Sequence, residues 1–171
     1  MTSISTLTVE PEQFRSLMST FPTGVAIVTT GAFEGEPSGL TVSSVSSVSL
    51  DPPTLLVCLN NKSRTLSEVL ANGTFAVNLL HEGGQGAAKL FASGERDRFD
   101  RVEWENATTF AGPHLVNDAH SIADCRVSRT LSMGDHQVIF GEIFRVEQQS
   151  PEHTAPLLYG MRRFSAWPTA A

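Results

Sequence analysis

The chain alternates short runs of β-branched and aromatic residues with turn residues, and no long helical segment connects one run to the next. A parallel sheet would need long crossover helices, whereas antiparallel strands can be joined by tight turns. The sequence therefore predicts a mainly β fold, an antiparallel barrel with a few short flanking helices. The expected strands cover residues 24–30, 39–44, 54–59, 75–80, 121–131 and 137–148, and a last strand begins near residue 156.

Helical periodicity is confined to three short segments. Apolar residues within 10–20 recur at the spacing of one helix face, which predicts an amphipathic helix that lies on the core as a lid. Residues 65–72 begin with a Thr-x-x-Glu capping box at Thr65 and end before Gly73, and residues 87–93 form a third short helix. These helices can flank a barrel but cannot build a parallel sheet.

Apolar side chains lie on both faces of the strand expected at 137–148. One face can line the interior of a barrel. The other face needs a second subunit or a covering helix, because a large exposed apolar patch on a strand favours association.

Composition restricts the class of protein. The 171 residues fit one domain spanning 1–171. Hydrophobic residues make up 40% and no apolar run reaches the roughly 18 residues of a membrane span, so a globular chain outside the membrane is expected. The first residues show neither a basic region nor a long apolar stretch, which predicts a cytoplasmic protein. A formal charge of −6 argues against binding to nucleic acid.

Several common sites have no sequence support. Cys58 and Cys125 lack C-x-x-C spacing and are expected to be reduced core thiols. The histidines show no metal-ligand spacing, so no metal site is predicted. The segment from Gly84 through Gly86 imitates a dinucleotide-binding fingerprint, but Lys89 occupies the third glycine position and no parallel sheet surrounds it.

Ser63-Arg64-Thr65 follows Asn60 at the junction between an expected strand and an expected helix. Free backbone N–H groups and the positive end of a helix favour anions at such a junction. The Arg64 guanidinium and two hydroxyls add the charge-assisted hydrogen bonds that a phosphate prefers. The segment is therefore either a phosphate site or an ordinary helix cap with a solvated arginine.

Thr41, Val42, Ser43 and Ser44 open a hydroxyl-rich segment that runs to residue 49. Hydroxyls and backbone groups at a strand end can bind a flat heterocycle edged with oxygen and nitrogen atoms. The alternative is an edge strand with one solvated face.

Gly134-Asp135-His136 lies between two expected strands, and Gly-Asp is a typical tight-turn dipeptide. One interpretation is a hairpin with an incidental histidine. The other places the His136 imidazole at the mouth of the barrel, where it can contact a cofactor.

Four segments taken together resemble the short-chain flavin reductases, the reductase components of two-component flavin-dependent monooxygenases. They are F-P-T-G-V-A-I-V-T-T from Phe21, T-V-S-S from Thr41 to the double proline at 52–53, S-R-T-L from Ser63, and G-D-H from Gly134. The resemblance covers about residues 14–164 and implies an FMN-binding split barrel.

The resemblance further implies a homodimer with flavin near the subunit interface. FMN or FAD would bind to Thr41, Val42, Ser43 and Ser44 at its ring, and NADH or NADPH would dock at His136. The phosphate region would be held by Asn60, Ser63, Arg64 and Thr65, and the ligand site would be bordered by Tyr159 and Phe164.

The implied reaction is hydride transfer from the nicotinamide to the flavin, with the reduced flavin diffusing to a partner monooxygenase. Two alternatives share the same barrel. One is a flavin-binding electron carrier without catalytic activity, and the other is an enzyme that resembles pyridoxamine phosphate oxidase.

Overall fold

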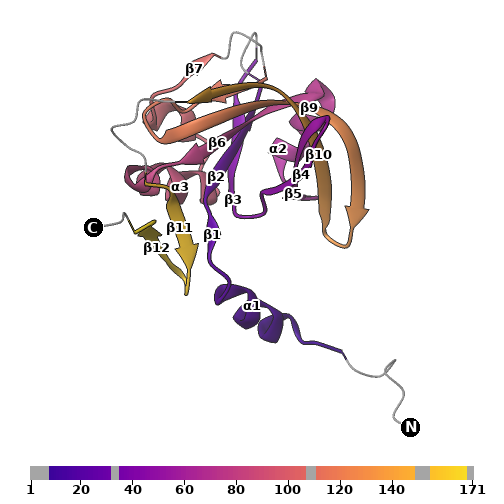
Figure 1. Cartoon of the computed structure of the whole chain (residues 1–171), viewed down its shortest axis with the longest axis vertical. Coiled ribbons are helices and arrows are strands. Elements are labelled where there is room, and N and C mark those ends of the chain that lie inside the picture. The colour runs from indigo at the N-terminus through magenta and orange to yellow at the C-terminus, as the bar shows by residue number, and fades with distance from the viewer. Residues whose placement is uncertain (1–7, 32–34, 107–110, 149–154, 169–171) are drawn as a thin grey trace.

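The computed structural model describes residues 8–31, 35–106, 111–148 and 155–168 (Figure 1). Its main feature is a seven-stranded antiparallel sheet in the order β3-β2-β6-β9-β10-β5-β4. The strands are β2 (Ala26–Thr30), β3 (Ser38–Val42), β4 (Ser46–Leu50), β5 (Pro53–Asn60), β6 (Thr74–Leu80), β9 (Ala119–Met133) and β10 (His136–Gln148).

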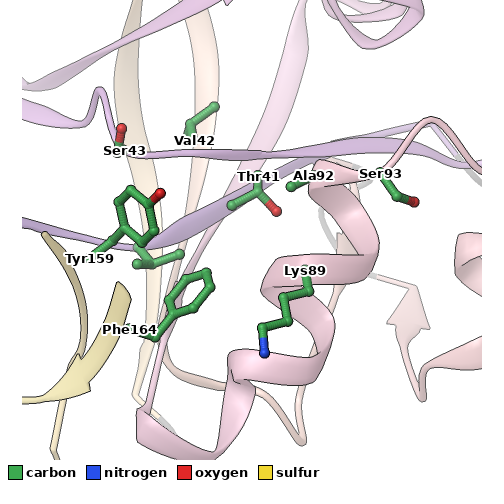
Figure 2. Close-up of a pocket in the computed structure, with 9 residues that line it drawn as sticks. Thr41, Val42, Ser43, Lys89, Ala92, Ser93, Tyr159 and Phe164 are labelled. Carbon is green, nitrogen blue, oxygen red and sulfur yellow. The ribbon is translucent and has the colours of Figure 1, made fainter. Parts of the chain in front are cut away.

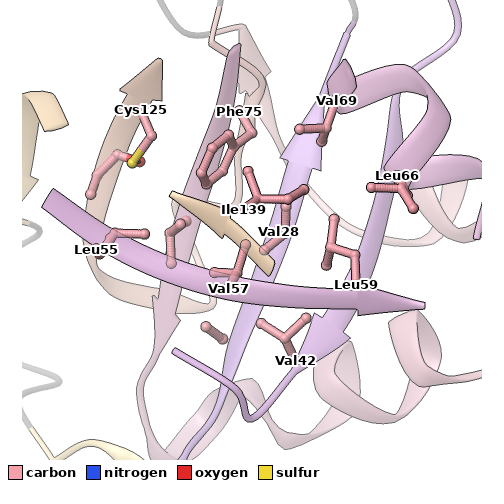
Figure 3. Packing of buried hydrophobic residues seen from close by; sticks show 13 residues of the cluster. Val28, Val42, Leu55, Val57, Leu59, Leu66, Val69, Phe75, Cys125 and Ile139 are labelled. Atoms are coloured by element: carbon pink, nitrogen blue, oxygen red, sulfur yellow. The ribbon is translucent and has the colours of Figure 1, made fainter. Parts of the chain in front are cut away.

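The sheet curls around one apolar core (Figure 3). Val28 of β2 and Val42 of β3, at one edge of the sheet, pack in the same cluster as Val57 of β5, which lies near the other edge. Phe75, Ile139 and other buried side chains fill the space between them. The predicted antiparallel barrel is therefore confirmed.

Helix α2 (Arg64–Asn72) packs Leu66 and Val69 into this core. Its C-terminal residue is followed by Gly73 with a φ of 69°, a left-handed conformation that glycine adopts without a steric cost. The predicted capping box at Thr65 is wrong, because the helix begins one residue earlier and Ser63 occupies the N-cap position.

β9 and β10 form a long hairpin that turns at Gly134 and Asp135, as the Gly-Asp dipeptide predicts. Register shifts interrupt their pairing next to Gly141. A Cβ atom at Gly141 would lie 2.5 Å from Cζ of Phe75 and 2.9 Å from Cβ of Cys125. Only a glycine lets β10 approach the core this closely.

A second apolar cluster lies outside the barrel wall. Helix α3 (Gln85–Ala92) packs Ala88 and Phe91 against Ile27, whose neighbours in β2 face the barrel interior. Leu157 in β11 (Leu157–Gly160) joins the same cluster. Both faces of β2 are thus covered, which explains its continuous apolar sequence.

A small sheet of β1 (Thr23–Gly24), β11 and β12 (Arg163–Ala166) stands beside α3. The short elements η2 (Glu82–Gly84), η3 (Arg98–Arg101), β7 (Glu105–Asn106) and β8 (Pro113–His114) complete the described part of the chain.

Helix α1 (Pro11–Ser19) projects away from the barrel (Figure 1). The predicted amphipathic helix is present, but its predicted position as a lid is wrong, because none of its residues is buried. Its apolar side chains Phe14 and Leu17 are 57% and 65% exposed. No described helix is long and apolar enough to span a membrane.

Candidate functional site

A cavity of about 410 Å³ lies between β3, α3 and the β11–β12 hairpin (Figure 2). Five of the predicted site residues line it: Thr41, Val42, Ser43, Tyr159 and Phe164. The other lining residues are Val25, Lys89, Ala92 and Ser93. The structure thus joins the T-V-S segment to the C-terminal aromatic residues, which are more than a hundred positions away in the sequence.

The hydroxyls at this cavity differ in what they can offer a ligand. Thr41 Oγ1 donates a hydrogen bond to the Ala88 carbonyl oxygen at 2.7 Å, and Ser93 Oγ donates to the Leu90 carbonyl oxygen at 2.7 Å. Both can still accept a hydrogen bond, since a hydroxyl has two lone pairs. Within the described part of the chain, Ser43 is exposed and its hydroxyl has no hydrogen-bond partner.

Ser44 serves the fold more than the cavity. Its Oγ donates to the Cys58 carbonyl oxygen at 3.1 Å and accepts from the Cys58 N–H at 3.0 Å. This pair of hydrogen bonds connects the turn after β3 to β5. Ser44 lines a different cavity from the one that Thr41 lines.

An aromatic pair forms one wall of the 410 Å³ cavity. The ring centroids of Tyr159 and Phe164 lie 5.0 Å apart, and the rings are tilted by 56°. The Lys89 Nζ lies 5.9 Å from the Phe164 ring centroid. Lys89 was not predicted to line a cavity, because the only signal at that position was its departure from a dinucleotide fingerprint.

A wider groove of about 1290 Å³ adjoins this cavity, and both are lined by Val25, Ser43 and Tyr159. The groove runs between α1, β1 and the start of β4. His120 lies in its wall, where burial lowers the histidine pKa and the charge of His81 lowers it further. The cavity and the groove are thus two hollows that share one wall.

The N-terminus of α2 offers free hydrogen-bond donors. Ser63 is its N-cap residue, yet its side chain makes no capping hydrogen bond. The Thr65 hydroxyl is unavailable, because Thr65 is buried and shares a 2.9 Å hydrogen bond with the Ser38 hydroxyl. Thr65 can therefore contribute only its backbone N–H to a ligand.

Arg64 lies on the surface at this helix end. Its Nη2 is 3.3 Å from Glu36 Oε2, and its Nε is 3.7 Å from Glu68 Oε1. Burial lowers the pKa of Arg98, and the charge of Arg64 lowers it further. An anion placed there would compete with Glu36 for Arg64.

His136 lies at the start of β10, directly opposite Asn60 at the end of β5. Its Nδ1 is 2.8 Å from Asp135 Oδ1, and this contact lowers the pKa of the Asp135 carboxyl through a hydrogen bond and through charge. The Asn61 N–H donates to the Asp135 carbonyl oxygen at 2.9 Å. His136 lines neither of the two cavities in the described single chain.

The predicted site residues thus form two groups. One group surrounds the 410 Å³ cavity, and the other, with Asn60, Arg64 and His136, lies where β5 leads into α2. No cluster of three or more potential metal ligands exists among the described residues.

The donor set of the first group fits a flat heteroaromatic ring. The volume of the cavity that these residues line falls within the roughly 300–1,000 Å³ of small-molecule pockets. Tyr159 and Phe164 provide faces for stacking, while Ser43 and Lys89 provide donors for ring oxygen and nitrogen atoms. A phosphate attached to such a ring fits the second group, where Arg64 meets a helix N-terminus.

Comparison with known proteins agrees with this chemistry. Residues 18–168 match the family described as "Flavin reductase like domain". A flavin reductase (NADPH) from Lentzea aerocolonigenes is 49% identical over 90% of this chain and 88% of its own length. A reductase subunit of a flavin-dependent monooxygenase from Mycobacterium tuberculosis is 30% identical over 88% of this chain and 79% of its own length.

A solved structure extends the likeness to three dimensions. The NADH:FAD oxidoreductase of Streptomyces globisporus, determined with NAD and FAD fragments, superposes with a TM-score of 0.86. The two proteins are 33% identical, and the match covers 96% of this chain and 99% of the other. The resemblance carried by the four sequence segments is confirmed: this chain belongs to the flavin reductase family.

Proposed function

We propose that this protein is an NAD(P)H-dependent flavin reductase that reduces FMN or FAD and releases the reduced flavin to a separate monooxygenase. The observation that carries the proposal is the cavity in which Thr41, Val42 and Ser43 meet Tyr159 and Phe164. The names of the relatives support both the enzyme class and the two nicotinamide donors. The reductase subunit from Mycobacterium tuberculosis supports the transfer of product to an oxygenase.

The bound flavin supplies the hydride acceptor and the reduced nicotinamide supplies the hydride, so the protein needs no nucleophile of its own. We assign Tyr159 and Phe164 to stacking against the ring and Ser43 to its polar edge. Thr41 and Ser93 can accept hydrogen bonds from ring N–H groups. Alignment of this kind can contribute several kcal/mol to lowering a barrier, about 7–11 in favourable intramolecular cases.

We assign the phosphate of the flavin to the N-terminus of α2. Ser63 contributes a hydroxyl that no cap uses, Arg64 a positive charge, and Thr65 a backbone N–H. Asn60 has its side-chain oxygen engaged by the Lys62 N–H at 2.9 Å, so we assign it to shaping the loop.

We propose that the active form is a homodimer. In the single chain, Phe144 and Val146 on the outer face of β10 are exposed, as are the apolar residues of α1. An exposed apolar surface of this kind favours association. We assign His136 to docking of the nicotinamide nucleotide. The cytoplasmic location stays a prediction.

Purified protein mixed with NADH or NADPH and free FMN or FAD should consume the nicotinamide only when flavin is present. The near-ultraviolet absorbance of the reduced nicotinamide measures this loss. An electron carrier without catalytic activity would bind flavin and leave the nicotinamide unchanged. An enzyme resembling pyridoxamine phosphate oxidase would instead reduce its flavin with pyridoxamine phosphate.

Light scattering after size-exclusion chromatography gives the mass of the protein in solution and tests the proposed homodimer.

A further inference from the structure

Lys89 is the one cationic side chain among the described residues that line the 410 Å³ cavity. It projects from α3 on the side where Phe164 stands, and its Nζ lies 5.9 Å from that ring (Figure 2). Its charge has no carboxylate within ion-pair distance in the described part of the chain. The neighbouring residues Ala88 and Phe91 are buried, so the helix that carries Lys89 is fixed in place.

The hydroxyls beside Lys89 cannot take over its role as a donor. The Thr41 proton is directed to the Ala88 carbonyl oxygen, and the Ser93 proton to the Leu90 carbonyl oxygen. The cavity thus presents acceptors at these two positions and a full positive charge at Lys89. Lys89 is exposed in the single chain, and its Nζ lies beside the Phe164 ring. A flat ring bound in the cavity would exclude water from this side chain, and its charge would then act more strongly than in bulk solvent.

Hydride transfer changes the charge of the ligand in this cavity. A hydride leaves C4 of NAD(P)H with its electron pair and forms a bond to N5 of the flavin. The donor becomes the oxidised nicotinamide cation, and the flavin ring gains one negative charge, which is shared by N1 and the C2 oxygen. A cation placed in advance near that negative charge stabilises the product and the transition state more than the reactant.

We propose that Lys89 is the residue that stabilises the negative charge of the reduced flavin in this cavity. The inference rests on the proposed function, because it needs flavin to occupy the 410 Å³ cavity. Lys89 keeps its proton throughout, and its contribution comes from charge. The residue thereby sets the balance between binding of oxidised and of reduced flavin, which a reductase that releases its product must control.

The test compares the affinity of each variant for oxidised flavin with its affinity for reduced flavin, the latter titrated without oxygen. Lys89→Met removes the charge and keeps the apolar stem, and Lys89→Arg retains the charge. Arg129→Met is the control for loss of a positive charge, because Arg129 is an exposed arginine on β9 outside both cavities. Circular dichroism and the melting temperature show whether each variant is folded.

For Lys89→Met we expect the affinity for reduced flavin to fall about 10- to 150-fold, the range that corresponds to losing a hydrogen bond to a charged group. The affinity for oxidised flavin should fall far less. The midpoint potential of the bound flavin should become more negative by the matching amount. Lys89→Arg and Arg129→Met should both bind like the wild type.

Equal losses for oxidised and reduced flavin would overturn the inference, since Lys89 would then provide only uniform binding. A defect seen with NADPH but not with NADH would also overturn it, because Lys89 would then bind the extra phosphate of the donor. If the wild-type protein neither binds flavin nor oxidises the nicotinamide with it, the proposed function itself fails. If the wild-type protein is active, and Lys89→Met keeps the wild-type ratio of affinities for reduced and oxidised flavin, the proposed role of Lys89 is wrong and the proposed function still holds.

Discussion

Asn60 and His136 face each other at the ends of β5 and β10, and Asn60 opens the loop that leads to Arg64. The pairing places the G-D-H turn beside the proposed phosphate site, although the two segments are more than seventy residues apart in the sequence. A nicotinamide nucleotide bound near His136 would therefore lie close to the flavin phosphate.

His136→Ala should raise the KM for NADH and leave the affinity for oxidised flavin nearly unchanged, because we assign His136 to the nicotinamide alone. Steady-state kinetics and a flavin titration on the same preparation measure both quantities. A purely structural histidine would instead lower the melting temperature and leave the kinetic constants normal. Asn60→Ala, which changes the paired residue, serves to show how much of any effect arises from the turn.

Arg64→Ala should weaken FMN binding by about 1.5–3 kcal/mol, the usual contribution of a hydrogen bond to a charged group. Riboflavin lacks the phosphate, so its affinity should be the same for the variant and the wild type. Fluorescence titration with both ligands gives the comparison. The matched control is Arg129→Ala, an exposed arginine on β9 outside both cavities. If Arg64→Ala left the FMN affinity unchanged, the flavin phosphate would not bind at the N-terminus of α2.

Gly141→Ala should destabilise the fold by about 1–3 kcal/mol, because the added methyl group overpacks a dense core. The nearest atoms, Phe75 Cζ and Cys125 Cβ, lie 2.5 and 2.9 Å from the position it would take. Gly86→Ala is the matched control on α3, where an added Cβ has nothing within 4 Å. That substitution should stabilise the protein by about 0.5–1 kcal/mol through helix propensity. Chemical denaturation measures both, and the two changes should have opposite signs.

Burial and, to a smaller extent, the charge of Asp124 together raise the pKa of the Cys125 thiol from 9.0 to about 12. In the unfolded chain the thiol loses its proton near the ordinary value, whereas the folded protein retains it. This contribution to stability is therefore complete below about pH 9 and is lost as the pH rises towards 12.

The free energy of unfolding should consequently fall with pH in this window more steeply for the wild type than for Cys125→Ala. Denaturation curves at several alkaline pH values measure the two slopes. Thiol labelling of the native protein at neutral pH gives a second readout: Cys125 should react far more slowly than the partly exposed Cys58. Parallel slopes and equal labelling rates would contradict the assignment.

The strands could be predicted from sequence because β-branched runs and turn residues encode them locally. The position of α1 could not, because its spacing shows which side chains share a face and not what that face contacts. Thr65 illustrates the same limit. Its sequence suggested a cap or a phosphate ligand, and the structure instead buries its hydroxyl against Ser38, a partner that sequence spacing does not reveal.

The lining of the 410 Å³ cavity could be predicted where it depends on motifs and could not where it depends on packing. Thr41, Val42 and Ser43 were identified from one segment, and the structure adds Lys89 from a helix that the sequence linked to no ligand. Tyr159 and Phe164 meet this segment only because the β11–β12 hairpin folds back beside α3.

The wall shared by the two hollows has a kinetic consequence. Val25, Ser43 and Tyr159 border both the cavity and the groove, so a ring bound in one hollow forms part of the surface that the other ring meets. If each of the two proposed substrates occupies one hollow, it would complete the binding site of the other. Initial-rate plots for the two substrates should intersect, as they do when a ternary complex forms, and parallel lines are not expected.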